Sequence, residues 1–178
     1  ALRNLGINGT IPKCASNLKL LESLDLSDNG ITSLASTLSW PLLKLLKLEE
    51  NNVTGRLECG KNFKALQILD VSSNPINVDV TEFLADFADL PALTELIANN
   101  AGLNEEFTFT IARNPSTFAV RFPSLQTLDL SYNQIKGSVD SWWGSLPKLH
   151  SLNLMRNNLV GVMPNGISSI ENIDLRLN

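Results

Sequence analysis

The hydrophobic positions of the chain repeat with a regular spacing. Leu125, Leu128 and Leu130 are followed by Asn133 and Ile135, which gives the pattern LxxLxLxxNxI. Leu128 and Leu130 alternate with polar residues, so their side chains point to the same side of a strand. One such strand cannot bury its apolar side alone. The pattern therefore predicts a stack of similar strands that share one core.

The same pattern occurs along nearly the whole chain. Its first hydrophobic position, which we call the anchor, is occupied by Leu21, Leu43, Leu66, Leu93, Leu125, Leu149 and Ile170. We count positions within a repeat from this anchor as zero, so that positions 3 and 5 are the inward strand residues. Position 8 is taken by Asn29, Asn51, Asn74, Asn133, Asn157 and Asn178, and by Ala101 in the remaining repeat.

A second recurring feature is the sequence GxIP, which ends a partial first repeat at residues 9–12. Related tails follow at residues 55–57, 137–139 and 161–164. Together these motifs resemble the plant-type leucine-rich repeats of plant receptor ectodomains and of trypanosomatid surface proteins. The resemblance implies an α/β solenoid, a horseshoe with a parallel sheet on its concave face. Loops, 3-10 turns and a short helix would form the convex face.

The resemblance also implies a structural role for the asparagines at position 8. In the family this side chain points inward and bonds backbone groups of the turn after the strand. A buried amide is tolerated there because those groups are otherwise unpaired. We expect no catalytic role for these asparagines, and a weaker ladder of hydrogen bonds at Ala101.

The repeats form one array over residues 1–178, about seven repeats plus the partial first one. Terminal repeats of solenoids normally carry polar caps, and neither end of this sequence shows one. We therefore expect the array to be a fragment that lacks both caps, with further residues beyond each end in the intact protein.

Two repeats in the middle of the array are enlarged. In the first insertion, Asp79 with Glu82 resembles a helix-capping box. Its apolar residues fall on one helical side, namely Phe83, Leu84, Phe87 and Leu90. This pattern predicts a short helix within residues 79–90 on the convex side, stopped by Pro91.

The second insertion, near residues 104–121, has alternating apolar residues on both sides of a turn signal at residues 114–116. The apolar residues are Phe107, Phe109, Ile111, Phe118 and Val120. This alternation predicts a small hairpin or an extended flap. The alternative is a convex loop that packs its own phenylalanines.

Cys14 and Cys59 occupy equivalent positions two repeats apart. Neighbouring strands lie about 4.8 Å apart, which places the two cysteines at roughly twice that distance. A disulfide requires Cα atoms within about 7 Å. We therefore predict two unpaired thiols that pack as small apolar residues, with a partner upstream of this sequence as the alternative for Cys14.

Other motifs give no support for catalysis, a cofactor or a metal. Residues 55–62 are one residue short of a phosphate-binding loop, and Asn62 replaces its hydroxyl. His150 has no companion at ligand spacing. Four aspartates share position 4 and are expected to face solvent, namely Asp25, Asp70, Asp129 and Asp174. They lie two repeats apart, about 10 Å, which is too far for a retaining glycosidase pair and at the outer limit for an inverting one. We predict that the chain is not an enzyme and has no cofactor or metal.

Charge and hydropathy narrow the partners further. The net charge of −4 argues against nucleic acid, and no apolar run reaches membrane-spanning length. Two glycosylation sequons begin at Asn8 and Asn52. Both asparagines lie next to inward positions, so we expect them to point outward and to be candidate glycosylation sites in an extracellular protein.

Positions 2, 4, 6 and 7 should line the concave face, and most are small polar residues. Leu45, Ile68 and Ile97 are apolar and lie on neighbouring strands, with Lys47, Glu49 and Glu50 on one flank. A contiguous apolar group rimmed by charge often marks a binding site, so we predict the primary contact surface there. The alternative is that the three residues only pack on each other or on an insertion. The next candidates are Tyr132, Met155 and Arg156.

These features predict a non-catalytic recognition module that binds a protein, peptide or glycan ligand through the concave face of a cell-surface or secreted protein. The alternative is an intracellular leucine-rich-repeat scaffold or regulator with a protein partner in the cytoplasm. The GxIP tails favour the first interpretation, and the unpaired cysteines favour the second.

Overall fold

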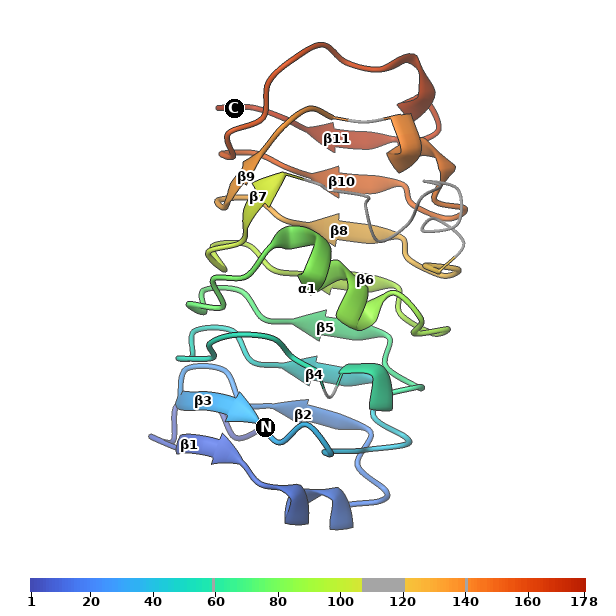
Figure 1. Ribbon diagram of the computed structural model, residues 1–178. Helices are drawn as coiled ribbons and strands as arrows, with labels where there is room; N and C mark the ends of the chain where they lie inside the picture. Colours follow the sequence, from blue (N-terminus) through green and yellow to red (C-terminus); the bar gives the residue numbers. More distant parts are fainter. Residues whose placement is uncertain (59, 107–120, 140) are drawn as a thin grey trace.

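The computed structural model describes the chain except for residues 59, 107–120 and 140. Short parallel strands stack in sequence order into one seven-stranded sheet (Figure 1). These strands are β2 (Ser23–Asp25), β4 (Leu45–Lys47), β5 (Ile68–Asp70), β6 (Glu95–Ile97), β8 (Thr127–Asp129), β10 (Ser151–Asn153) and β11 (Asn172–Asp174). Each repeat therefore contributes one strand, as the hydrophobic spacing predicts.

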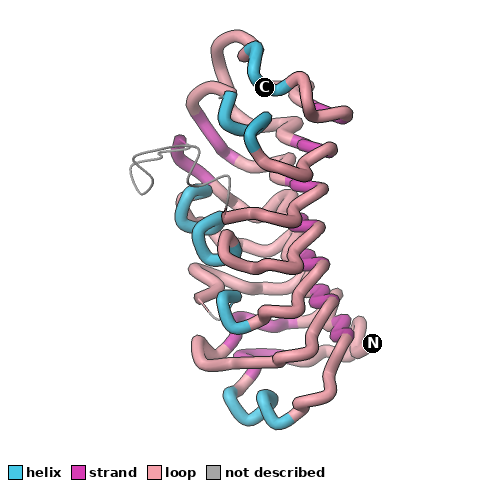
Figure 2. Tube along the Cα trace, turned by 90° about the vertical axis from the view of Figure 1, so that its right-hand side faces the viewer, coloured by secondary structure: helices cyan, strands magenta, loops and turns pink. Residues whose placement is uncertain are grey.

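The other elements lie outside this sheet. Two small parallel sheets pair β1 (Asn8–Ile11) with β3 (Gly30–Leu34), and β7 (Asn104–Glu106) with β9 (Gln134–Lys136). The helical elements are α1 (Val80–Phe87) and the 3-10 turns η1 (Lys13–Asn17), η2 (Gly60–Asn62), η4 (Ser141–Ser145) and η5 (Asn165–Ile167). Figure 2 shows the large sheet along one side and the helical elements along the other. The predicted solenoid is confirmed.

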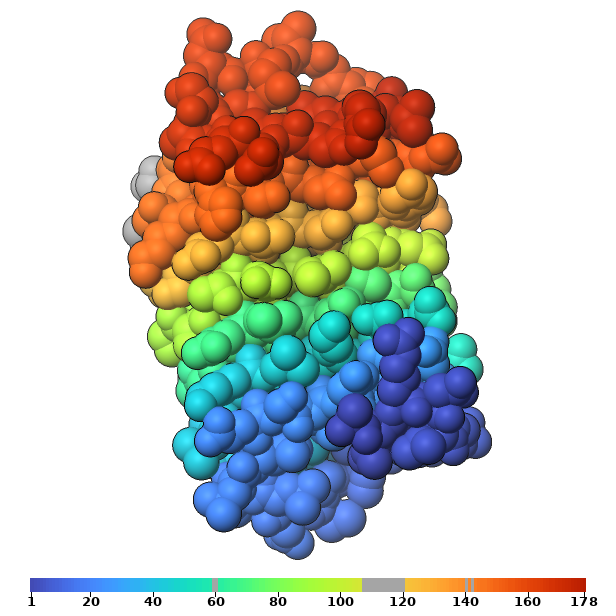
Figure 3. Space-filling model, turned by 180° about the vertical axis from the view of Figure 1, so that it is seen from behind, coloured from blue at the N-terminus to red at the C-terminus, as the bar shows by residue number. Residues whose placement is uncertain are grey.

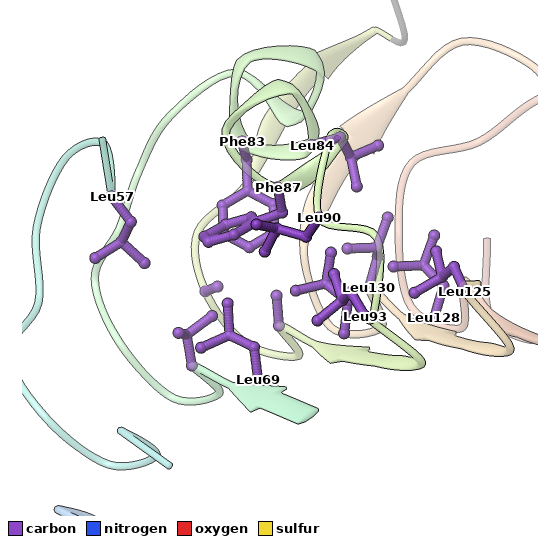
Figure 4. Packing of buried hydrophobic residues seen from close by; sticks show 14 of the residues in the cluster. Leu57, Leu69, Phe83, Leu84, Phe87, Leu90, Leu93, Leu125, Leu128 and Leu130 are labelled. Atoms are coloured by element: carbon purple, nitrogen blue, oxygen red, sulfur yellow. The ribbon is translucent and has the colours of Figure 1, made fainter. Parts of the chain in front are cut away.

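The core lies between these two sides. Every inward strand residue at position 3 from Leu46 to Leu152 is at most 1% exposed. Figure 4 shows such leucines packed together with the side chains of α1. Leu18 lies three residues before its anchor, the place that the buried Trp40 and Phe63 take in the next two repeats, yet it is 55% exposed. It lies at the end of the array, where no repeat stacks on its outer side.

The asparagine column forms the predicted hydrogen-bond ladder. In Asn74, Oδ1 accepts from the Val53 N–H at 2.9 Å, and Nδ2 donates to the carbonyls of Leu48 and Val71 at 2.8 and 3.0 Å. The side chain thus joins two repeats through backbone groups. Asn74 is 2% exposed, so water cannot replace these bonds.

Ala101 interrupts this ladder as the sequence indicates. Because residue 101 is alanine, the Ile76 N–H has no asparagine oxygen to bond there, and it donates to the Asn74 carbonyl at 2.9 Å instead. Nδ2 of Asn133 still reaches the Ala98 carbonyl at 2.9 Å. Alanine at residue 101 therefore changes the hydrogen-bond partner of the Ile76 N–H, while the Ala98 carbonyl keeps a donor. The lower strength of the ladder at this point stays a prediction.

Helix α1 confirms the interpretation of the first insertion. Its apolar side is buried, and Phe83 and Phe87 form an edge-to-face pair with ring centroids 5.2 Å apart. The predicted end at Pro91 is wrong, because the helix ends at Phe87. The chain leaves the helix early enough for Leu90 to turn into the core, where its carbonyl accepts from the Leu93 N–H.

Asp79 caps this helix. Its carboxylate accepts from the backbone N–H groups of Thr81 at 2.6 Å and Glu82 at 3.3 Å. Replacing Asp79 with alanine leaves two N–H groups without this acceptor, so we expect a loss of about 1 kcal/mol in the free energy of unfolding. Urea denaturation measures it. Glu82→Ala serves as the control and should change stability by less than about 0.5 kcal/mol. Equal effects would contradict the assigned cap.

Of the predictions for the second insertion and the two cysteines, only the one for Cys14 falls on described residues. The alternating segment of the second insertion and Cys59 lie outside the described residues. Cys14 is unpaired, as predicted. Its predicted packing is wrong, because Cys14 is exposed in η1, a turn that buries none of its residues.

Candidate ligand-binding face

The solvent side of the seven-stranded sheet is formed by positions 2, 4, 6 and 7 of the repeats, and we call it the concave face. Figure 3 shows this side, with the repeats as successive bands from blue to red. Strand pairing places position 2 residues side by side, namely Ser23, Leu45, Ile68, Glu95, Thr127, Ser151 and Asn172. Position 4 residues form a second row, namely Asp25, Lys47, Asp70, Ile97, Asp129, Asn153 and Asp174. The predicted columns are therefore rows on one surface.

Three apolar residues interrupt these polar rows. Leu45 pairs directly with Ile68 on the next strand, whereas Ile97 pairs with Asp70 and stands diagonally from Ile68. All three are half-buried, and they are not part of the hydrophobic core cluster on the other side of the sheet. We call Leu45, Ile68 and Ile97 the apolar diagonal. The geometry brings them together as predicted, and their role in binding stays a prediction.

The aspartates of position 4 serve the turn after each strand. Oδ1 of Asp129 accepts from the Ser131 N–H at 2.9 Å and from its hydroxyl at 2.6 Å. Asp70 makes the same pair of bonds to Ser72 and is only 8% exposed. The prediction that all four face solvent is therefore wrong for Asp70, which stands between the long side chains of Lys47 and Ile97 in the position 4 row.

Position 7 adopts the left-handed conformation in every repeat. The residues with positive φ there are Asp28, Glu50, Ser73, Asn100, Tyr132, Arg156 and Leu177. Since the conformation recurs whatever the side chain, it belongs to the fold and does not single out a site. At this position Arg156 lies over the exposed ring of Tyr132, with Cζ 5.3 Å from the ring centroid. This contact adds a weak cation–π attraction.

Met155 lies beside this pair. Its sulfur is 3.7 Å from Nη2 of Arg176, and its carbonyl accepts from the Tyr132 N–H at 2.8 Å. The second predicted group of contact residues is therefore contiguous. Arg176 is held by Asp174 at 2.6 Å, and this contact lowers the pKa of Asp174.

Acidic residues gather near the start of the array. Arg3 donates through Nε to Asp28 at 2.7 Å, and its Nη2 lies 3.7 Å from Glu49. The interaction of the Glu50 carboxyl group with the Asp28 carboxyl group one repeat earlier raises the pKa of Glu50 and lowers that of Asp28. Opposite pKa directions on two neighbouring carboxyl groups indicate crowded negative charge.

The distribution of charge was not part of the sequence prediction. With Arg3 of the partial repeat included, the concave face carries eight acidic and four basic residues, and the rest of the chain carries equal numbers of both. The acidic ones are Asp25, Asp28, Glu49, Glu50, Asp70, Glu95, Asp129 and Asp174, and the basic ones are Arg3, Lys47, Arg156 and Arg176.

The whole net charge of −4 therefore lies on the concave face. It lies on the part from β2 to β6, which we call the acidic half, because the charges from β8 onward balance. Asp28 and Glu95 belong to this half and were missed as site residues. Adding up charge by column, instead of over the whole chain, is the signal that finds them.

The two sequon asparagines are exposed, as expected. Nδ2 of Asn8 donates to the Gly6 carbonyl at 2.8 Å, while the backbone N–H of Asn52 donates to the Ile31 carbonyl at 2.9 Å. Their glycosylation stays a prediction. Within the described residues, no group of His, Cys, Asp and Glu could hold a metal ion. None of the helices in that same part of the chain has the length and apolar character needed to span a membrane.

Stacked repeats with buried leucines, an asparagine ladder and an open sheet face define a leucine-rich-repeat solenoid. Family models agree: a model of two leucine-rich repeats matches residues 123–176, and a single-repeat model matches residues 17–34. The chain belongs to the leucine-rich-repeat family, and plant receptor-like proteins are among its relatives.

The relatives include two different classes of protein, a tubulin-specific chaperone and plant receptor-like proteins. Mouse tubulin-specific chaperone E is 33% identical over 144 residues, which cover 79% of this chain and 26% of the chaperone. Arabidopsis receptor-like protein 41 is 29% identical over 163 residues, covering 92% of this chain and 15% of that protein. The chain thus spans about a quarter or less of these two relatives.

Solved structures show the same fold. The Arabidopsis receptor kinase HAESA ectodomain, solved with a peptide hormone ligand, has a TM-score of 0.73 and 23% identity. The match covers 94% of this chain and 28% of the ectodomain. A crystal structure of a pollen receptor kinase 3 has a TM-score of 0.69 and 23% identity, covering 92% of this chain and 75% of that one.

Proposed function

We propose that this chain is a non-catalytic recognition module that binds a protein or peptide segment through its concave face. The observation behind the proposal is the apolar diagonal, three half-buried residues on the solvent side of the sheet and outside the core. An apolar group rimmed by charged residues suits a partner that buries a bulky side chain there. This chemistry favours a protein or peptide over a glycan.

The setting of this module is proposed to be the cell surface or the extracellular space. Support comes from the plant receptor-like relatives and from ectodomains of similar fold solved with peptide hormones. A second candidate is an intracellular regulator that binds a protein, supported by the tubulin-chaperone relative and by the free, exposed Cys14. The complete gene discriminates between them, because only the first setting requires a signal peptide.

The binding face is tested by changing the apolar diagonal to serine. The triple variant Leu45→Ser, Ile68→Ser, Ile97→Ser is compared with the native chain for binding of peptides selected on the native chain from a random display library. Truncating one central apolar anchor typically costs about 1–2 kcal/mol of affinity, so we expect the triple variant to bind at least about tenfold more weakly.

A matched control changes three exposed apolar residues elsewhere. Val160, Val162 and Met163 are 71%, 86% and 56% exposed and do not belong to the concave face. Changing them to serine should leave peptide affinity as it is. Circular dichroism confirms that each variant is folded. Unchanged affinity in a folded diagonal variant would refute the proposed binding face.

A further inference from the structure

The concave face combines an apolar centre with a strong charge of one sign, and this combination describes its partner. We infer that the ligand of the acidic half is a cationic segment in which lysines or arginines flank a bulky apolar residue. The inference rests on the proposed function and adds the chemical class of the partner. It follows from the position of the charges around the apolar diagonal.

The acidic residues stand on both sides of the apolar diagonal. Glu95 pairs with Ile68 in the position 2 row. Glu49 and Glu50 follow strand β4, which supplies Leu45, and Asp28 lies one repeat earlier. A basic segment whose apolar residue rests on Leu45 and Ile68 therefore meets carboxylates before and after that residue. Such complementarity speeds association and selects against partners of the wrong sign.

The chain itself shows how a guanidinium is held in this place. Arg3 lies between Asp28 and Glu49, with atoms 2.7 and 3.7 Å apart. Its side chain remains 53% exposed, and those of Asp28 and Glu49 are 24% and 25% exposed. Glu50 and Glu95 make no ion pair within the described part of the chain. Two carboxylates are therefore left for a cation from outside.

Lys47 is the basic residue that opposes such a ligand, and it stands between Asp25 and Asp70 in the position 4 row. These two neighbours carry the opposite charge, so the field of Lys47 is offset locally. Arg3 and Lys47 together leave the acidic half at −4. A surface with this charge attracts cationic segments at low ionic strength.

The size of the acidic half sets the length of the segment. The steps from β2 to β6 cover about 15 Å at the usual strand spacing. This distance corresponds to about five residues of extended chain. Peptides of about nine residues therefore reach past both edges of the acidic half.

The test uses three fluorescein-labelled peptides of this length with the same leucine centre, flanked by lysines, serines or glutamates. We expect the lysine peptide to bind most tightly and the glutamate peptide least tightly. The affinity of the lysine peptide should fall as the salt concentration rises from low to physiological, because exposed charges are screened. A lysine peptide that binds no better than the serine peptide, or not at all, overturns the inference.

Neutral variants locate the charge. Glu49→Gln with Glu50→Gln should weaken binding of the lysine peptide at least about fivefold. The matched control is Glu105→Gln with Glu106→Gln, an exposed acidic pair on β7 outside the concave face, and it should have no effect. Equal effects of both pairs also overturn the inference.

The outcome is separable from the proposed function. If library-selected peptides depend on the apolar diagonal but are neutral or acidic, the face binds peptides and the cationic class is wrong. If selected peptides ignore the apolar diagonal, the proposed function itself fails.

Discussion

Replacing Asn133 with alanine is expected to lower the free energy of unfolding by about 3–5 kcal/mol. Oδ1 of Asn133 accepts from the N–H groups of Ala101 and Leu103, both at 3.0 Å. Its Nδ2 donates to the carbonyls of Ala98, Leu130 and Ser131 at 2.9, 2.9 and 3.1 Å. The residue is 7% exposed, so the backbone groups that lose their bonds to Asn133 are not reached by water.

The position of Asn133 explains why the effect should be large. Ala101 breaks the ladder in the preceding repeat, so Asn133 is the asparagine that bonds across the enlarged repeat. Each buried polar group left without a partner costs about 1–3 kcal/mol. Some of the deserted groups will find new partners, which keeps the total below the simple sum.

Asn29 provides a matched control. Its side chain also makes five hydrogen bonds to backbone groups, but two of them are exposed and the other three are only partly buried. Water can replace those bonds, so Asn29→Ala should lower stability by about 1 kcal/mol. Urea denaturation of both variants measures the difference. Equal losses would show that burial does not set the strength of the ladder.

The strand stack could be predicted from the sequence because one chemical requirement fixes it. Leu128 and Leu130 must both face inward, and a shift by one residue would expose both. The same requirement holds in every repeat, so the columns predict the observed pairing of Leu45 with Ile68. The asparagine ladder follows from the same registration.

The end of α1, the burial of Asp70 and the exposure of Cys14 depend on local contacts that the hydrophobic spacing does not describe. The end of α1 at Phe87 follows from the place where Leu90 must enter the core. Asp70 is buried because it stands between the long side chains of Lys47 and Ile97 in its row. Cys14 lies in a 3-10 turn that buries nothing. In each case the hydrophobic pattern identified the residue's repeat but not its local contacts.

The candidate site was predicted in part. The apolar diagonal and the group around Tyr132 were found because they depart from the small polar residues of their columns. The acidic half was missed because Asp28 and Glu95 are ordinary polar residues when taken one at a time. Only their arrangement in rows shows that the whole net charge lies on one half of one face.

Replacing Phe87 with alanine is expected to lower the free energy of unfolding by about 3–5 kcal/mol. Phe87 is 1% exposed, packs edge-to-face on Phe83, and faces the core beneath α1 (Figure 4). With Leu57 and Leu69 it borders a small internal void. Removing the ring enlarges that void, and packed strands can close it only in part.

Phe87→Leu keeps most of the volume and should lower stability by less than about 1.5 kcal/mol. Urea denaturation compares the two variants, and equal losses would show that the ring shape, and not the cavity, matters at this site. Helix α1 lies across the core from the concave face. The folded Phe87→Ala variant should therefore bind library-selected peptides as the native chain does. Loss of binding would mean that the packing of α1 in the enlarged repeat holds the concave face in its binding geometry.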